Sequence, residues 1–197
     1  MASVQLAWAD ETATQHFAET LAAQPALSHA FIALQGTLGA GKTTLVRHLL
    51  RALGVQGRIK SPTYAVVEPY EVPGLQIWHF DFYRFSDPRE WEDAGFRDIF
   101  ASPGLKLAEW PSQAGGMLPV PDLQILIEPV ADTAAGRAAV ESAGDTVGDT
   151  ARVVTLSPGS AAGVALVQAA AQALMPPVVP PAMQPAAPGA AAEAVRS

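Results

Sequence analysis

Residues 36–43 read Gly-Thr-Leu-Gly-Ala-Gly-Lys-Thr, which fits the phosphate-binding pattern Gly-x-x-x-x-Gly-Lys-Ser/Thr. The glycines of such a loop let backbone N–H groups turn inward around a phosphate, and the helix that follows adds a partial positive charge. In this motif the lysine, here Lys42, reaches the β- and γ-phosphates. The hydroxyl of the last residue, here Thr43, binds Mg²⁺. The motif therefore predicts a site for a nucleoside triphosphate with Mg²⁺.

The segments on either side of the loop give it the setting that the motif requires. Residues 30–34 are apolar and predict a buried strand. After the loop, apolar residues recur with helical spacing at Leu45, Val46, Leu49, Leu50 and Leu53. A strand, a glycine-rich loop and a helix in this order are the P-loop unit. The alternative, a glycine-rich turn before an ordinary helix, is disfavoured by these flanks.

Two further predicted strands each end in a carboxylate. Residues 75–80 lead to Asp81, and residues 105–108 lead to Glu109. Ligands of parallel α/β sheets bind outside the carboxyl ends of the strands, so both acids are expected on the side of the P-loop. Phosphoryl transfer needs acidic groups there to hold Mg²⁺ and to orient the attacking water. For each acid considered alone, the alternative to a role in the site is that it is a surface charge at the end of a strand.

Three other residues are candidates for the site, each with a simpler alternative. Thr63, in Ser-Pro-Thr-Tyr at residues 61–64, is placed where P-loop enzymes often bring a hydroxyl to the γ-phosphate; otherwise the segment is a proline turn. His79 shares a strand face with Asp81 by the period of two, and packing or orienting is favoured over catalysis. Trp110 is expected to be a packing aromatic.

The composition restricts the classes of function. The chain of 197 residues has no cysteine, which excludes disulfides and thiolate metal sites. Its net charge of −7 argues against holding nucleic acid by its own field. No apolar run approaches the ~20 residues of a membrane span. No Lys or Arg precedes Lys42, so a secretory signal with a basic start is not expected. A cytoplasmic protein is expected.

The chain divides at about residue 158. Strand and helix patterns alternate over residues 1–158, which predicts an α/β domain: a P-loop NTPase-like three-layer sandwich with a mainly parallel, mixed central sheet. Residues 159–197 form an Ala- and Pro-rich tail that is expected to be disordered, with a helix at 161–175 marginal on its own. Residues 130–150 are expected to form an exposed loop, and residues 87–95 a capped helix that ends at Gly95.

The chain also carries four ordered motifs. They are GTLGAGKTT at residues 36–44, KSPTYAVVEPY at 60–70, HFDFYR at 79–84 with DPREWEDAGFRDIF at 87–100, and LAEWP at 107–111. In these motifs and their order the chain closely resembles the bacterial TsaE (YjeE) family, the ATPase of tRNA threonylcarbamoyladenosine synthesis. The similarity runs from about Leu6 to Glu128 and resumes at residues 151–153.

The resemblance implies roles for individual residues. Lys42, Asp81 and Glu109 would be catalytic, with Mg²⁺ on Thr43 and Glu109 and with Asp81 near the metal and the water. Thr63 would belong to a switch-like loop. The residues expected to bind the nucleotide are Glu11, which lies near the base, Gly36, Gly39, Ala40, Gly41, Lys42, Thr43, Thr44 and Thr63. Either Arg137 or Arg152 matches the family's late nucleotide contact, and neither is assigned.

The resemblance also implies partners. The family supports threonylcarbamoyl transfer by TsaD, in a heterodimer with TsaB, to the adenosine beside the anticodon; tRNA is expected only indirectly through that complex. The ATPase is expected to be slow alone.

A P-loop small-molecule kinase is one alternative function, although no arginine cluster for a lid follows residue 100. A non-catalytic nucleotide-gated subunit is another, and it would need neither Asp81 nor Glu109. The absence of asparagine excludes the guanine-reading Asn-Lys-x-Asp element.

Overall fold

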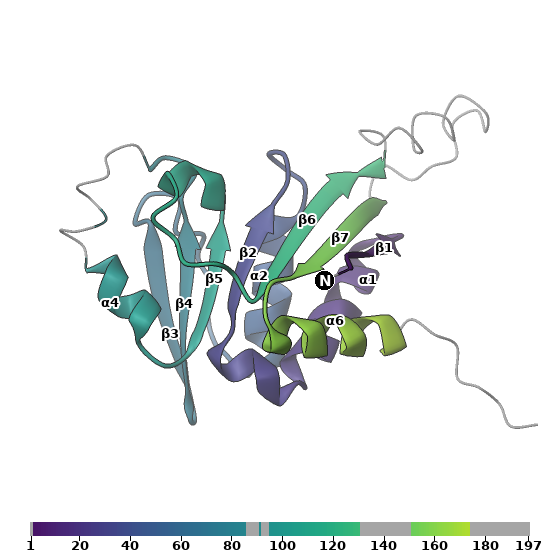
Figure 1. Cartoon of the computed structure of the whole chain (residues 1–197), viewed down its shortest axis with the longest axis horizontal. Coiled ribbons are helices and arrows are strands. Elements are labelled where there is room, and N and C mark those ends of the chain that lie inside the picture. Colours follow the sequence, from purple (N-terminus) through teal and green to yellow (C-terminus); the bar gives the residue numbers. More distant parts are fainter. Residues whose placement is uncertain (1, 86–90, 92–94, 131–150, 174–197) are drawn as a thin grey trace, which may run out of the picture.

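The computed structural model describes residues 2–85, 91, 95–130 and 151–173 (Figure 1). Its strands are β1 (Val4–Trp8), β2 (Phe31–Gln35), β3 (Val67–Val72), β4 (Leu75–Asp81), β5 (Leu105–Glu109), β6 (Leu123–Pro129) and β7 (Arg152–Pro158). Its helices are α1 (Glu11–Ala22), α2 (Lys42–Ala52), α4 (Phe96–Ala101) and α6 (Ala161–Ala173), with the short 3₁₀ helices η1 (Pro25–His29) and η2 (Pro111–Ala114).

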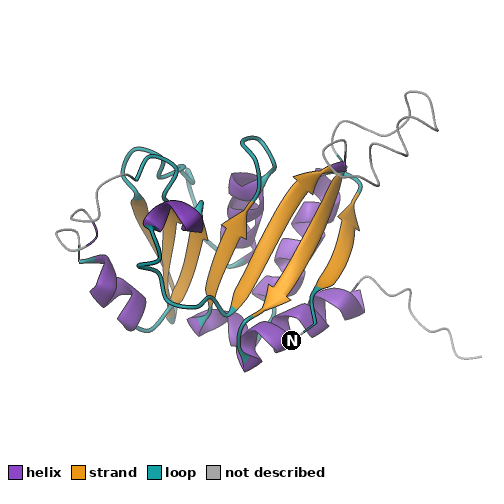
Figure 2. Cartoon of the chain, turned by 45° about the horizontal axis from the view of Figure 1, so that its top comes forward, coloured by secondary structure: helices purple, strands orange, loops and turns teal. Residues whose placement is uncertain are grey.

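These strands form one mixed sheet (Figure 2), in the order β1-β7-β6-β2-β5-β4-β3 (Figure 1). The central strands β6, β2, β5 and β4 run parallel, whereas β1, β7 and β3 pair antiparallel with their neighbours. The parallel strands place their carboxyl ends at one edge of the sheet, which is where α/β proteins bind ligands. The predicted α/β class and mixed central sheet are confirmed.

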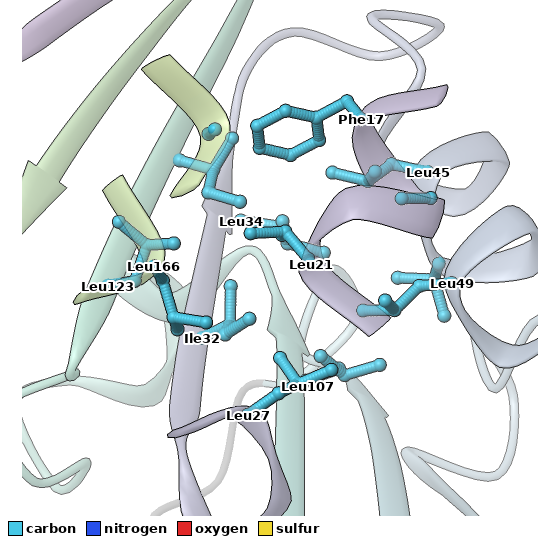
Figure 3. Packing of buried hydrophobic residues seen from close by; sticks show 14 of the residues in the cluster. Phe17, Leu21, Leu27, Ile32, Leu34, Leu45, Leu49, Leu107, Leu123 and Leu166 are labelled. Atoms are coloured by element: carbon cyan, nitrogen blue, oxygen red, sulfur yellow. The ribbon is translucent and has the colours of Figure 1, made fainter. Parts of the chain in front are cut away.

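The sheet separates two apolar clusters because successive side chains of a strand point to opposite faces. On one face, Ile32 and Leu34 of β2 pack with side chains of α1, α2 and α6; Figure 3 shows Leu45 and Leu49 of α2 and Leu21 of α1 in this cluster. On the other face, Phe31 and Ala33 belong to an aromatic-rich cluster that includes residues of α4 and η2. Packing in these clusters positions β2 and α2 on either side of the P-loop.

Helix α6 corrects the predicted end of the domain at residue 158. Leu166, Val167 and Ala170 are buried, and the helix contacts α1, η1, β6 and β7. A Cβ at Gly163 would lie 1.7 Å from the carbonyl oxygen of Asp122, so glycine permits this close approach. The small residues that make the helix marginal alone allow it to dock closely, and the domain extends at least to Ala173.

The rest of the predicted tail, residues 174–197, and most of the predicted loop at 130–150 lie outside the described residues. So does most of the predicted helix at 87–95. Gly95 itself is described: it has φ 67° and directly precedes α4. None of the helices in the described ranges combines the length and apolar composition of a membrane span.

Candidate nucleotide site

The P-loop turns sharply between β2 and α2, and its glycines make the turn possible. Gly36, Gly39 and Gly41 have φ values of 139°, 79° and 111°, a region that side chains rarely adopt. A Cβ at Gly36 would lie 2.2 Å from the carbonyl oxygen of Ile127, so the loop lies directly on β6. Gly41 precedes α2 and offers no side-chain cap, which leaves the helix N-terminus suited to an anion.

The ammonium group of Lys42 lies inside this loop. Nζ donates hydrogen bonds to the carbonyl oxygens of Gly36 and Thr37, both at 2.8 Å, and lies 3.9 Å from the centre of the Trp110 ring. Burial lowers the pKa of Lys42, and the nearby Glu109 and Asp81 carboxylates partly oppose that shift. Within the described ranges no carboxylate is close enough to form an ion pair with Nζ, so its charge suits a phosphate.

Asp81 and Glu109 lie at the carboxyl ends of adjacent parallel strands, as the sequence predicted. They face each other in register across β4 and β5, and both are buried, at 4% and 2% exposed. The hydroxyl of Thr43, in the first turn of α2, donates to Oε2 of Glu109 at 2.9 Å. A cavity of about 470 Å³ is lined by these three residues together with Lys42 and Thr63. The sheet edge and the P-loop therefore form one polar cavity.

The segment that contains Thr63 closes onto Asp81. Thr63 Oγ1 donates to Oδ2 of Asp81 at 2.7 Å, and the backbone N–H of Tyr83 donates to Oδ1 at 3.0 Å. Val66, just beyond Thr63, accepts a hydrogen bond from the backbone N–H of Asp81 although its φ is 63°. A β-branched residue at positive φ is strained, and such strain often marks a functional site. The structure thus brings Thr63 to the site.

Trp110 shares this kind of strain, with φ 57° directly after Glu109. Its ring lies over Lys42 and contacts the ring of Tyr83, with centroids 5.0 Å apart. Trp110 therefore packs, as the sequence predicted, but it packs on a residue of the site.

Arg84 was not singled out from the sequence. It lines the same cavity with its guanidinium 4.5 Å from the Tyr64 ring; the only signal was its place in the HFDFYR motif.

His79 contacts Glu109 rather than Asp81. It is fully buried, and its Nε2 lies 2.9 Å from Oε1 of Glu109. The sequence placed His79 and Asp81 on one face but could not show that the neighbouring strand would bring Glu109 within hydrogen-bonding distance. The expectation of an orienting residue fits this position.

The oxygen atoms gathered here fit Mg²⁺ shared with a phosphate. The hydroxyl of Thr43 and the carboxylates of Glu109 and Asp81 are the hard oxygen ligands that Mg²⁺ prefers. In the part of the chain that the structure describes, no group of three or more His, Cys, Asp or Glu side chains forms a metal cage. Mg²⁺ usually keeps several waters and binds through one or two carboxylates plus substrate phosphates, so this sparse donor set is suitable.

A smaller hollow of about 140 Å³ adjoins the P-loop at Gly39, Ala40 and Gly41. Its lining includes Glu11, Thr44 and Arg152. Glu11, expected near the base, forms an ion pair with Nε2 of His48 at 2.9 Å. Arg152 donates through Nε to the carbonyl oxygen of Ala40 at 3.0 Å. Arg152 therefore reaches the loop from β7, a position that only the strand register reveals; Arg137 lies outside the described residues.

Comparisons with known proteins agree on the family. The family model described as "Threonylcarbamoyl adenosine biosynthesis protein TsaE" matches residues 8–139. A tRNA threonylcarbamoyladenosine biosynthesis protein TsaE from Haemophilus influenzae is 45% identical over 112 residues, which are 57% of this chain and 71% of that protein. The TsaE protein of Bacillus subtilis is 37% identical over 101 residues, or 51% of this chain and 63% of that protein.

A solved structure agrees on the fold. The crystal structure of YdiB from Bacillus subtilis matches with a TM-score of 0.61 at 23% identity, and the match covers 87% of this chain and 95% of that one. The resemblance suggested by the four sequence motifs is thereby confirmed, and the chain belongs to the TsaE family of threonylcarbamoyl adenosine biosynthesis proteins.

Proposed function

We propose that this chain is an Mg²⁺-dependent ATPase that supports threonylcarbamoyl transfer to the adenosine beside the tRNA anticodon. One observation carries the proposal: Asp81 and Glu109 meet in register at the sheet edge, in the same cavity as Lys42 and Thr43. Phosphoryl transfer needs this combination of a phosphate-binding loop, a lysine and strand-end acids. A non-catalytic nucleotide-gated subunit would not need both acids there.

Each residue has a defined task in this proposal. The backbone of the P-loop and the ammonium of Lys42 bind the β- and γ-phosphates. Among the described residues Nζ forms no ion pair; it contacts the carbonyl oxygens of Gly36 and Thr37 and the Trp110 ring, so its charge is available to a phosphate. Thr43 and Glu109 would hold Mg²⁺, which neutralises charge on the phosphate oxygens when it is bound. The cavity is closed on one side by Trp110, which keeps Lys42 out of bulk water.

Asp81 acts on the attacking water. Its Oδ2 accepts a hydrogen bond from the Thr63 hydroxyl at 2.7 Å, which indicates where a water would donate once Thr63 turns toward the γ-phosphate. A carboxylate in this position orients the water by accepting a hydrogen bond from it, and the Thr63 hydroxyl then donates to the phosphate. Arg84 lies close enough to the cavity to stabilise charge that develops on the phosphoryl oxygens.

Membership of the family supports a proposal about partners. We infer that the chain binds the TsaB–TsaD heterodimer and reaches tRNA only through that complex. Its net charge of −7 supports this, because tight tRNA binding at physiological salt needs several phosphate contacts from Lys and Arg. Tyr64, 84% exposed and adjacent to Thr63, gives a partner a means to sense the segment that contacts Asp81.

The test is phosphate release from ATP by the full chain, alone and with the TsaB–TsaD heterodimer, in Mg²⁺ and in EDTA. We expect slow Mg²⁺-dependent release by the chain alone and faster release with the heterodimer, since a group supplied by a partner can add orders of magnitude. Release at equal rates in Mg²⁺ and EDTA would overturn the metal site. No effect of the heterodimer would overturn the proposed partnership.

A further inference from the structure

The buried ring of His79 lies behind a carboxylate of the nucleotide site. Nε2 of His79 is 2.9 Å from Oε1 of Glu109, and Oε2 of the same carboxylate accepts the hydroxyl of Thr43 at 2.9 Å. Glu109 and Thr43 line the cavity, whereas His79 is fully buried and does not. The carboxylate is thus held from two directions, by β4 through His79 and by α2 through Thr43.

The hydrogen-bond partners of the ring assign its tautomer. A neutral imidazole carries a proton on one nitrogen and accepts at the other. Nδ1 of His79 is buried and has no partner among the residues that the structure describes, so a proton there would be a buried donor without an acceptor. A proton on Nε2 faces a carboxylate oxygen instead. The proton therefore lies on Nε2, which donates to Oε1 of Glu109.

This bond restricts how the Glu109 carboxylate can turn. β4 pairs with β3 on one side and with β5 on the other, so the base of the histidine side chain is fixed within the sheet. With Oε1 committed to His79, Oε2 remains beside the Thr43 hydroxyl on the cavity side. A freely rotating carboxylate would have to be ordered each time a cation binds, and here that ordering precedes binding.

We propose that His79 is a positioning residue for the cation end of the nucleotide site: it holds Oε1 of Glu109 so that Oε2, together with the Thr43 hydroxyl, is presented to Mg²⁺. This inference rests on the proposed function, since it needs Mg²⁺ to bind with nucleotide in the cavity. Hydrogen-bond partners that orient metal ligands typically change metal affinity by about 10–100-fold when they are removed.

Three variants of the full chain test the role. His79→Leu fills a similar volume without a donor, His79→Gln places an amide N–H near the position of Nε2, and His79→Asn carries an amide that is too short to reach Glu109. The measurement is ADP affinity by titration calorimetry, in EDTA and across a Mg²⁺ series. We expect the half-maximal Mg²⁺ concentration to rise about 10–100-fold in the Leu and Asn variants, with the Gln variant much closer to wild type. ADP affinity in EDTA should be unchanged in all three.

Wild-type Mg²⁺ dependence in His79→Leu would overturn the role, and so would a Gln variant as impaired as the Leu variant. Should His79→Leu fail to fold, the Gln and Asn variants carry the same comparison. Long-range ¹H–¹⁵N spectra of the nucleotide-free protein test the geometry independently, and an Nδ1–H tautomer for His79 would overturn it. A wild-type chain without Mg²⁺-dependent ADP binding would instead overturn the proposed function, while the tautomer would still report on the contact between His79 and Glu109.

Discussion

Replacing Leu166 with alanine should destabilise the domain strongly, although the residue lies far along the chain from the P-loop. Leu166 is 0% exposed and lies beside Leu123 of β6 and Ile32 of β2 in the core (Figure 3). We expect the sheet and α1 to relax only in part into the space that Leu166→Ala leaves, because both are packed against other elements. We therefore expect the free energy of unfolding to fall by about 3–5 kcal/mol, in the upper part of the range for buried leucines.

In a domain of this size, that loss corresponds to a melting temperature lower by about 6–20 °C. Gln168→Ala is the matched control, because Gln168 lies on the exposed face of the same helix and its replacement should change stability by no more than about 0.5 kcal/mol. Circular dichroism melts of both variants and the wild type provide the measurement. Equal melting temperatures for Leu166→Ala and Gln168→Ala would refute the docking of α6 on the sheet.

Three further predictions concern the site. Gly36→Ala should weaken ADP binding more than Gly39→Ala in calorimetric titrations, because both have positive φ but only the former adds a Cβ that overlaps β6; equal losses would contradict this. Arg84→Ala should slow phosphate release by about ten-fold or more with little change in ADP affinity, and an unchanged rate would remove Arg84 from the site. Thr63→Val should slow release while Thr63→Ser retains most of it, and similar rates in the two variants would show that the hydroxyl facing Asp81 is not used.

The parts of the site that the sequence predicted are those set by local pattern. The P-loop is contiguous, and its flanking strand and helix follow from apolar periodicity alone. Asp81 and Glu109 were found because each directly follows an apolar run, and parallel strands bring such positions to one edge. Thr63 was reached by analogy with mobile loops of P-loop enzymes; its hydroxyl lies at Asp81, and its contact with the γ-phosphate stays a prediction.

What the sequence did not predict depends on packing between distant segments. Helix α6 is rich in alanine and marginal in isolation, and its packing against α1 and the sheet, with Gly163 close to Asp122, makes it part of the domain. The contact of His79 with Glu109 depends on how β4 and β5 are aligned, and alternation along one strand cannot reveal that alignment. Arg152 reaches Ala40 because β7 lies between β1 and β6, an order that the sequence does not encode locally.

We propose that the strand-end acids Asp81 and Glu109 make this cavity a hydrolytic site rather than a binding site. Single-turnover phosphate release from ATP, measured for wild type and Asp81→Asn with ADP affinity in parallel, tests it most directly. We predict Mg²⁺-dependent release in the wild type, a rate about 10²–10³-fold lower in Asp81→Asn, and nearly equal ADP affinities. Equal release by the two proteins, or release by the wild type that is the same in EDTA, would exclude a hydrolytic role for these acids.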